Sequence, residues 1–214
     1  TGLREIPTHE MYALVDISEQ ELEDSVFNLE QEMSAEFGEQ FAKAEGTAFV
    51  SGNGVGKPEG FLTNSEIGTV NSGNGTALTA DGLISLYHEP KAEYAQNGSF
   101  IMSRSTLAAV RKLKTSSNDY VFQAGNQLSG GMVSTILGAP YVQATDMPAV
   151  GAGNKPIAFG DFRRGYMIVD RVNLAILRDP FTQATSGNVR YVARKRIGGQ
   201  VILPEAIKTQ TVSA

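Results

Sequence analysis

The stretch that decides the fold is residues 18–62, SEQELEDSVFNLEQEMSAEFGEQFAKAEGTAFVSGNGVGKPEGFL, which predicts a long helix followed by a glycine-rich turn. Ser18 and Glu21 form a capping-box pattern, in which each side chain satisfies a backbone N–H that the first helical turn leaves free. Apolar residues then recur at steps of three and four, which places them on one helix face; they are Leu22, Val26, Leu29, Met33, Phe37 and Phe41. We therefore expect one helix from about Glu19 to Phe49, roughly 45 Å long at 1.5 Å per residue.

The end of this stretch predicts a structural turn. Gly52, Gly54 and Gly56 tolerate backbone angles that end a helix, and Pro58 lacks the N–H that a continuing helix needs. A phosphate-binding loop would have four residues between its glycines and a Ser or Thr after the lysine, whereas Pro58 follows Lys57. A dinucleotide-binding loop would follow a strand instead of a helix. A turn is therefore favoured over a nucleotide site, and we expect no cofactor.

Composition narrows the class of protein. The chain has 214 residues, of which 41% are hydrophobic, as in folded domains. It contains no cysteine, which excludes disulfides, thiolate metal sites and cysteine nucleophiles. No apolar run is long enough to span a membrane, and there is no export signal. We expect a protein of the cytoplasm that has no contact with a membrane.

The charges are unevenly distributed. The net charge of −5 argues against a protein whose main task is to bind nucleic acid. Residues 1–50 carry twelve acidic residues and two basic ones, whereas residues 161–196 carry eight basic and three acidic ones. These charges are either solvated surface or a contact between the acidic part of one copy and the basic part of another. The candidates for such a contact are Glu5, Glu10, Glu19, Glu23, Arg178, Arg190, Arg194, Lys195 and Arg196.

The rest of the chain predicts short helices followed by many strands. Polar and apolar residues alternate over residues 1–17, which favours a strand. Thr79 and Ser103 are expected to cap helices that end near Tyr87 and Leu113. Further strands are expected at 100–102, 120–127, 140–144, 157–160, 166–169, 174–177, 188–196 and 201–203. Helices dominate the first half and strands the second, so the fold class is α+β.

The sequence contains no clear reaction centre. His9 and His88 have no partner at the spacing of metal ligands. Asp161, Asp170 and Asp179 recur every nine residues, as turn residues at strand ends do, although a two-carboxylate hydrolase would also use such residues. We expect no catalytic residue and no metal site.

Segments that follow one another along the chain resemble the major capsid protein of tailed double-stranded DNA bacteriophages. They are EFGEQFAKAEGTAFVSGNGVGKPEGFL, FIMSRSTLAAVRKLK, ILGAPYVQATDMPA, IAFGDFRRGYMIVDR, LAILRDPF, VRYVARKRIGG and EAIK. The resemblance covers nearly the whole chain. It implies the Hong Kong 97 fold, with a peripheral domain of a long spine helix and long antiparallel strands, and an axial domain of a mixed sheet flanked by helices.

The resemblance also implies a division of the chain. Residues 1–17 resemble the returning strand of an extended loop, and residues 18–62 the first part of the peripheral domain. Residues 63–170 resemble the axial domain, residues 171–197 the strand pair of the peripheral domain, and residues 198–214 the return to the axial domain. The family's N-terminal arm and outgoing loop strand have no counterpart here. We therefore expect an N-terminally truncated copy from a phage or prophage.

The function implied by the resemblance is structural. The protein would be a non-enzymatic shell subunit that assembles in the bacterial cytoplasm into hexamers and pentamers of an icosahedral virion capsid. The shell would enclose double-stranded DNA without sequence-specific binding. Its partners would be other copies, with a scaffold segment, a maturation protease and a portal in the full system. The alternatives are the shell of an encapsulin-like bacterial nanocompartment and a hydrolytic or ligand-binding enzyme.

Overall fold

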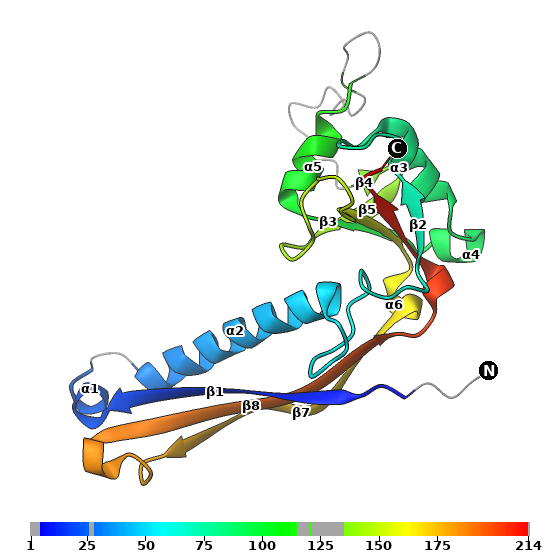
Figure 1. Ribbon diagram of the computed structural model, residues 1–214. Helices are drawn as coiled ribbons and strands as arrows, with labels where there is room; N and C mark the ends of the chain where they lie inside the picture. The colour runs from blue at the N-terminus through cyan, green and yellow to red at the C-terminus, as the bar shows by residue number, and fades with distance from the viewer. Residues whose placement is uncertain (1–4, 26–27, 115–119, 121–134, 214) are drawn as a thin grey trace. The chain divides into compact units, whose positions relative to one another are not determined.

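The computed structural model describes residues 5–25, 28–114, 120 and 135–213, and it divides the chain into two compact units. Unit 1 comprises Thr1–Gly60 and Ile168–Gln200, and unit 2 comprises Phe61–Met167 and Val201–Ala214. The chain therefore passes from one unit to the other three times (Figure 1). These crossings lie close to the boundaries expected from the resemblance, whose assignment to peripheral and axial domains stays a prediction.

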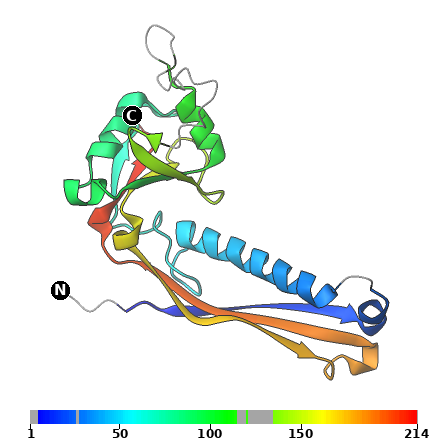
Figure 2. The same cartoon turned by 180° about the vertical axis from the view of Figure 1, so that it is seen from behind.

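Unit 1 is built on a sheet of long strands. β8 (Asn188–Val201) lies between β1 (Thr8–Ser18) and β7 (Tyr166–Asp179). β1 and β8 are antiparallel and pair over their full length, from Thr8 opposite Gly198 to Ser18 opposite Asn188. The helix α2 (Leu29–Ser51) runs along one face of this sheet (Figures 1 and 2).

The core of unit 1 lies between α2 and β8. Side chains alternate between the two faces of a strand, and every second residue of β8 is buried against the helix: Val189, Tyr191 and Ala193. Phe37 and Phe41 of α2 pack into the same cluster, and Leu22 and Met33 pack against it. The apolar helix face predicted from the sequence is therefore confirmed for these residues. Val26 lies outside the described residues.

The expected single helix from about Glu19 is wrong. A short helix, α1 (Glu19–Asp24), ends at Ser25, whose backbone is extended at φ −70° and ψ 127°. The long helix begins anew after Asn28, whose side-chain oxygen accepts the N–H of Gln31 at 3.2 Å. Ser and Asn compete with helical hydrogen bonds and favour caps. The predicted cap at Ser18 is present, because its hydroxyl accepts the N–H of Glu21 at 3.1 Å.

Two expected strand breaks are also wrong. Residues 166–169 and 174–177 belong to one continuous strand, β7, because the polar residues between them are exposed and cost nothing on that strand. β8 likewise continues through Gly198 and Gly199 to Val201. A Cβ on Gly198 would lie 2.5 Å from the carbonyl oxygen of Pro7. The glycine there marks a close approach of two backbones, not the end of a strand.

The glycine-rich segment after α2 turns the chain back on the helix end. The N–H of Gly60 donates to the carbonyl of Gly52 at 2.8 Å, and Asn53 pairs with Glu59 as an isolated antiparallel bridge. Gly54 and Gly56 have φ values of 75° and 68°, a conformation that favours glycine. Pro58 is buried, and a Cβ on Gly52 would lie 2.1 Å from its carbonyl oxygen.

Unit 2 holds a mixed sheet with helices packed against it. Its strand order is β2-β9-β6-β3-β5-β4, with the pairs β2–β9 and β3–β5 parallel and the others antiparallel. The strands are β2 (Gly68–Asn71), β3 (Ser99–Met102), β4 (Thr135–Ile136), β5 (Ala139–Gln143), β6 (Ile157–Gly160) and β9 (Ile207–Thr211). The helices are α3 (Ala80–His88), α4 (Ala92–Ala95), α5 (Arg104–Arg111) and α6 (Phe162–Gly165).

The core of unit 2 is aromatic and aliphatic. Phe100 and Phe159 are fully buried with ring centroids 4.5 Å apart, and Leu86 of α3 and Val110 of α5 belong to the same cluster. Thr79 and Ser103 cap α3 and α5 as predicted. The extended piece expected at 120–127 lies outside the described residues except for Tyr120. The mixed sheet and the α+β class are thus those predicted from the sequence.

A polar network ties α4 to the segment before β9. Glu205 lies 2.6 Å from the Lys91 ammonium and accepts the Tyr94 hydroxyl at 2.9 Å. The hydrogen bond to Glu205 raises the pKa of Tyr94 to about 12. Both partners of Glu205 hold its carboxylate ionised, and its pKa is lowered mainly by Lys91.

We expect Gly52→Ala and Gly38→Ala to change the stability of the protein in opposite directions. The new Cβ at position 52 meets backbone oxygens at 2.1 and 2.5 Å, and such overpacking costs about 1–3 kcal/mol. At Gly38, within α2, nothing lies within 4 Å of the added Cβ, so Ala should stabilise the helix by roughly 0.5–1 kcal/mol. Urea unfolding measures both; equal effects would contradict the packing described for the turn.

Candidate assembly interface

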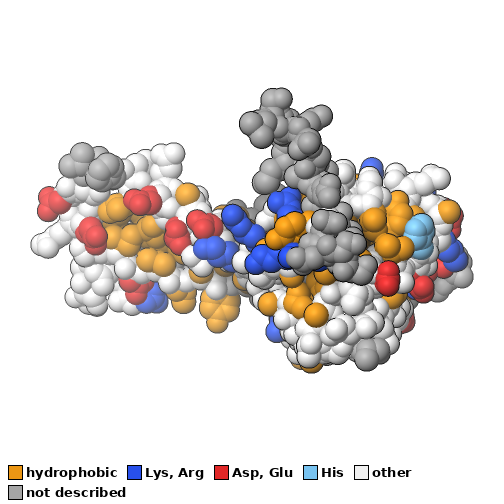
Figure 3. Space-filling model, turned by 90° about the horizontal axis from the view of Figure 1, so that it is seen from above, with side chains coloured by type: hydrophobic (Ala, Val, Ile, Leu, Met, Phe, Trp, Pro, Cys, Tyr) orange, Lys and Arg blue, Asp and Glu red, His pale blue; other side chains and the backbone are white. Residues whose placement is uncertain are grey.

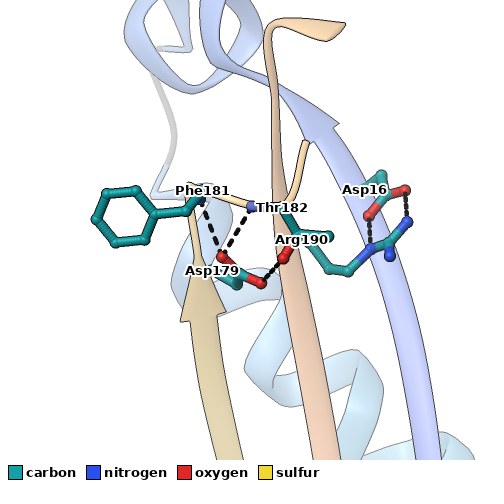
Figure 4. Close-up of polar contacts among 5 residues, drawn as sticks. All are labelled: Asp16, Asp179, Phe181, Thr182 and Arg190. Carbon is teal, nitrogen blue, oxygen red and sulfur yellow. Dashed lines mark hydrogen bonds and ion pairs between the residues drawn. The ribbon is translucent and has the colours of Figure 1, made fainter. Parts of the chain in front are cut away.

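The candidate contact residues lie mainly on the sheet of unit 1, where they first meet partners in the same chain. Arg190 of β8 is directly opposite Asp16 of β1. Its guanidinium Nε and Nη2 donate to the two carboxylate oxygens of Asp16 at 2.7 Å each (Figure 4). This bidentate hydrogen bond lowers the pKa of Asp16 and raises that of Arg190.

Two further arginines also pair with acids of the same unit. Arg194 Nε lies 3.3 Å from Glu10 Oε1, and Arg178 Nε lies 3.4 Å from Glu30 Oε1. Glu30 also accepts the Tyr191 hydroxyl at 2.7 Å, so this carboxylate links the start of α2 to both β7 and β8. Burial, together with this hydrogen bond, raises the pKa of Tyr191.

Lys195 differs from the arginines because it is largely buried. Its Nζ lies 2.6 Å from Glu45 Oε1 of α2 and 3.9 Å from Asp170 Oδ1 of β7. The side chains of Lys195 and Glu45 are exposed by only 19% and 13%. This lysine faces the helix and belongs to the interior of unit 1. Removing either partner would leave a charge poorly solvated.

Only some of the candidates are left without an internal partner. In the part of the chain that the structure describes, Arg196, Glu5, Glu19 and Glu23 are exposed and form no ion pair. The separation of acidic and basic segments along the sequence is therefore partly resolved within the chain. Contact between subunits through the candidate residues stays a prediction. Alternation along β1 and β8 carries a signal for these pairs, since it places Asp16 and Arg190 on one face.

The sheet face that points away from α2 carries apolar side chains between the ion pairs. Tyr12 and Leu14 of β1 are 71% and 52% exposed, and they lie opposite Arg194 and Val192 of β8. Because α2 covers the other face, this one is open in the chain by itself. It combines exposed apolar area with arginines, which are both enriched at protein interfaces.

The outward side of α2 is acidic. Glu32, Glu36 and Glu39 are exposed on it, and the only basic side chain of α2, Lys43, pairs with Glu39 at 2.9 Å. Figure 3 shows acidic side chains beside hydrophobic ones on the face of unit 1 that is seen from above. Unit 1 therefore presents an acidic helix side and an arginine-bearing sheet side.

The three regularly spaced aspartates have structural roles. Asp161 is buried and caps α6 by accepting the N–H of Arg164 at 3.2 Å. Asp170 lies beside Lys195, and Asp179 accepts the backbone N–H groups of Phe181 and Thr182. His88 packs edge-on against Tyr87, and His9 lies in unit 1, so these histidines and Asp161 do not converge on one site.

Two searches of the described residues found nothing. They contain no group of three or more His, Cys, Asp or Glu side chains that could hold a metal ion. No helix among them is long and apolar enough to cross a membrane.

Comparison with solved structures defines the class of the fold. It is that of Hong Kong 97-type capsid proteins. The chain is 36% identical to the subunit in the capsid of an empty GTA particle, with a TM-score of 0.89, and covers 100% of this chain and 79% of that one. The capsid protein of Gordonia phage Cozz shares 14% identity at a TM-score of 0.72, with coverage of 99% and 72%. An encapsulin, the holo-SrpI complex of Synechococcus elongatus PCC 7942, shares 17% identity at 0.68, with coverage of 96% and 74%. The last two likenesses show the fold alone.

The sequence itself assigns the family. The model of the phage capsid family matches residues 1–212, so the chain belongs to that family and is a structural shell protein. No curated protein matches the sequence. The resemblance found in the sequence segments is therefore confirmed.

We expect the Asp16–Arg190 pair to stabilise the protein only above acid pH. The pKa of Asp16 is lowered below its ordinary 3.8 in the folded chain. The stabilisation is therefore complete above that value and is lost as the pH falls through the lower, folded pKa. A double-mutant cycle with Asp16→Asn and Arg190→Gln, followed by urea unfolding, should show coupling at pH 6 that shrinks below pH 3.8. Coupling that is the same at both pH values would contradict the pairing.

Proposed function

We propose that this protein builds an icosahedral shell by assembling into hexamers and pentamers. The observation that carries the proposal is the 36% identity at a TM-score of 0.89 over the whole chain to a GTA capsid subunit. That particle was computed with C5 symmetry, which involves five equivalent copies. Repeated contacts between identical subunits close into such a shell when each contact is weak and directional.

The content of the shell is double-stranded DNA, which the protein encloses without sequence-specific binding. The net charge of −5 and the acidic side of α2 support this part of the proposal. A strongly basic wall would adhere to packed DNA by releasing its counterions. Tight binding of the assembled protein to duplex DNA that weakens steeply with salt would contradict it.

The proposal extends to partners and place. The shell assembles in the bacterial cytoplasm and becomes part of the virion, with a scaffold segment, a maturation protease and a portal as partners in the full system. The protein itself is not an enzyme. This is supported by the structural roles of Asp161, Asp170 and Asp179, the carboxylates that a hydrolase would have needed.

An encapsulin-like nanocompartment is the second candidate. The likeness to the SrpI encapsulin favours it, but at 17% identity this likeness concerns the fold alone. Two features would distinguish it: a cargo peptide bound inside the shell, and an enzyme enclosed in place of DNA. The greater identity to the GTA capsid favours the capsid.

The structure decides which charges are suited to contacts between subunits. Arg194 is 58% exposed and only loosely paired with Glu10, and Arg196 is exposed without an ion pair among the described residues. Lys195 lies between them in sequence but on the opposite face of β8, where Glu45 holds it. A reversal of all three charges would therefore damage the subunit itself. Arg194 and Arg196 alone test the contact.

We expect Arg194→Glu combined with Arg196→Glu to reduce shell formation severely while the subunit stays folded. The reversal replaces attraction by repulsion wherever acidic residues of a neighbour face this strand. Electron microscopy and size-exclusion chromatography of the natural gene product expressed alone measure assembly, and thermal unfolding measures the subunit.

The matched control is Lys57→Glu combined with Arg163→Glu, which makes the same change of net charge at exposed positions outside the sheet of unit 1. This control should still form particles. Normal assembly of the Arg194/Arg196 variant would remove these arginines from the contact. If the unaltered protein forms neither shells nor rings, the proposed function itself is wrong.

A further inference from the structure

The outer strand β7 exposes apolar side chains on both of its faces. Arg178 reaches Glu30 of α2, so the even-numbered residues before it face the helix, and Ile176 is among them. Leu177 therefore faces the open side. Ile176 is 39% exposed and Leu177 is 64% exposed. A partner that covered only one face of the sheet would leave one of these two side chains in water, whereas a partner at the strand edge would cover both.

This edge also lacks the usual protection. In the part of the chain that the structure describes, β7 pairs on one side only, with β8. Natural proteins protect free edges with lysines, prolines or bulges. Residues 174–177 read Leu-Ala-Ile-Leu, and the adjacent Arg178 lies by Glu30, so it adds little net charge to the edge. Pro180 limits the strand only at its end. Such an edge is expected to be covered in the working protein.

Phe181, two residues beyond β7, is held in an exposed position. Its side chain is 85% exposed. The Asp179 carboxylate accepts the backbone N–H of Phe181 at 2.9 Å and that of Thr182 at 3.1 Å, and it also bonds the Thr182 hydroxyl. These hydrogen bonds lower the pKa of Asp179. In Figure 4 the ring projects away from the sheet, past β7.

A fixed aromatic side chain is suited to binding. The turn around Asp179 is already ordered by its hydrogen bonds, so little conformational entropy remains to be lost when Phe181 is covered. Burial of one phenylalanine side chain contributes favourably in proportion to its apolar area, and aromatic residues are enriched in interface cores. The ring and the apolar edge beside it therefore form one continuous patch: Leu174, Ile176, Leu177 and Phe181.

We propose that this patch at the β7 edge contacts the same patch of a second copy of this chain, with Phe181 as its anchor. The inference rests on the proposed function, because shell assembly places identical copies side by side. A second copy is the favoured partner because the patch is apolar and its one charge is internally paired, so two such patches meet without repulsion. Like patches that meet in this way form an isologous contact, which is the commonest symmetry between identical subunits.

The chain lacks cysteine, so Phe181→Cys creates a single thiol at the proposed anchor. We expect a small maleimide to modify Cys at position 181 about tenfold more slowly in assembled particles than in dissociated subunits, because interface anchors are shielded from water. Oxidation of the particles should join two chains through this thiol. Val55→Cys is the control: Val55 is 77% exposed in the glycine-rich turn of unit 1, and it should give no such dimer.

Each outcome separates the two proposals. Particles in which position 181 stays as reactive as in free subunits would overturn the edge contact and leave the shell proposal intact. Absence of any oligomer of the unaltered protein would overturn both. If Phe181→Cys folds with an unchanged unfolding temperature but does not assemble, the anchor role is supported. Leu177→Cys then supplies the labelling test at the same edge, and free reactivity of that thiol in particles would again overturn the contact.

Discussion

The burial of one face of α2 against β8 is the constraint on which unit 1 depends. Phe37 and Phe41 contact Val189, Tyr191 and Ala193, and this cluster fixes which way every residue of β8 points. Because the strand alternates, the arginines between these residues must face away from the helix. The polar ends of the contact are held as well, by Glu30 at the start of α2 and by Glu45 toward its end. A single apolar contact thus determines where the charges of the strand can act.

The distribution of charge has two levels as a result. Along the sequence, acidic and basic segments are far apart, and this separation suggests contacts between molecules. In space, β1 and α2 bring acids beside β8, and Asp16, Glu10 and Glu45 each meet a basic residue of that strand. Opposite charges in distant segments therefore indicate pairing, and the chain itself is the first partner available. What remains for other copies is the set of charges that alternation turns outward and leaves unpaired, such as Arg196.

Local patterns predicted much of the fold, and long-range contacts account for the errors. The caps at Ser18, Thr79 and Ser103 depend on a side chain and an N–H three residues apart, so the sequence contains the whole interaction. The break near Ser25 could not be predicted from periodicity, because the apolar residues on either side of it still pack into one core. Gly198 was expected to end a strand, but it permits the backbone of Pro7 to come close, and this neighbour is distant in sequence. The candidate arginines were found from charge alone, whereas Phe181 gave a weaker signal, a Pro-Phe pair after an aspartate.

The magnitudes of the two kinds of interaction suggest how they divide the work of assembly. An exposed ion pair contributes only about 0–1 kcal/mol, and several arginines of unit 1 would exchange an internal partner for an external one. Their net contribution to cohesion is then smaller still, so their effect lies in orientation and in rejecting wrong contacts. Burial of one large apolar side chain contributes roughly 1.5–3 kcal/mol. A shell subunit with many symmetric contacts needs each of them to be weak enough to correct errors during assembly. An apolar strand edge oriented by flanking charges meets both requirements, because its area supplies cohesion and its charges select the register.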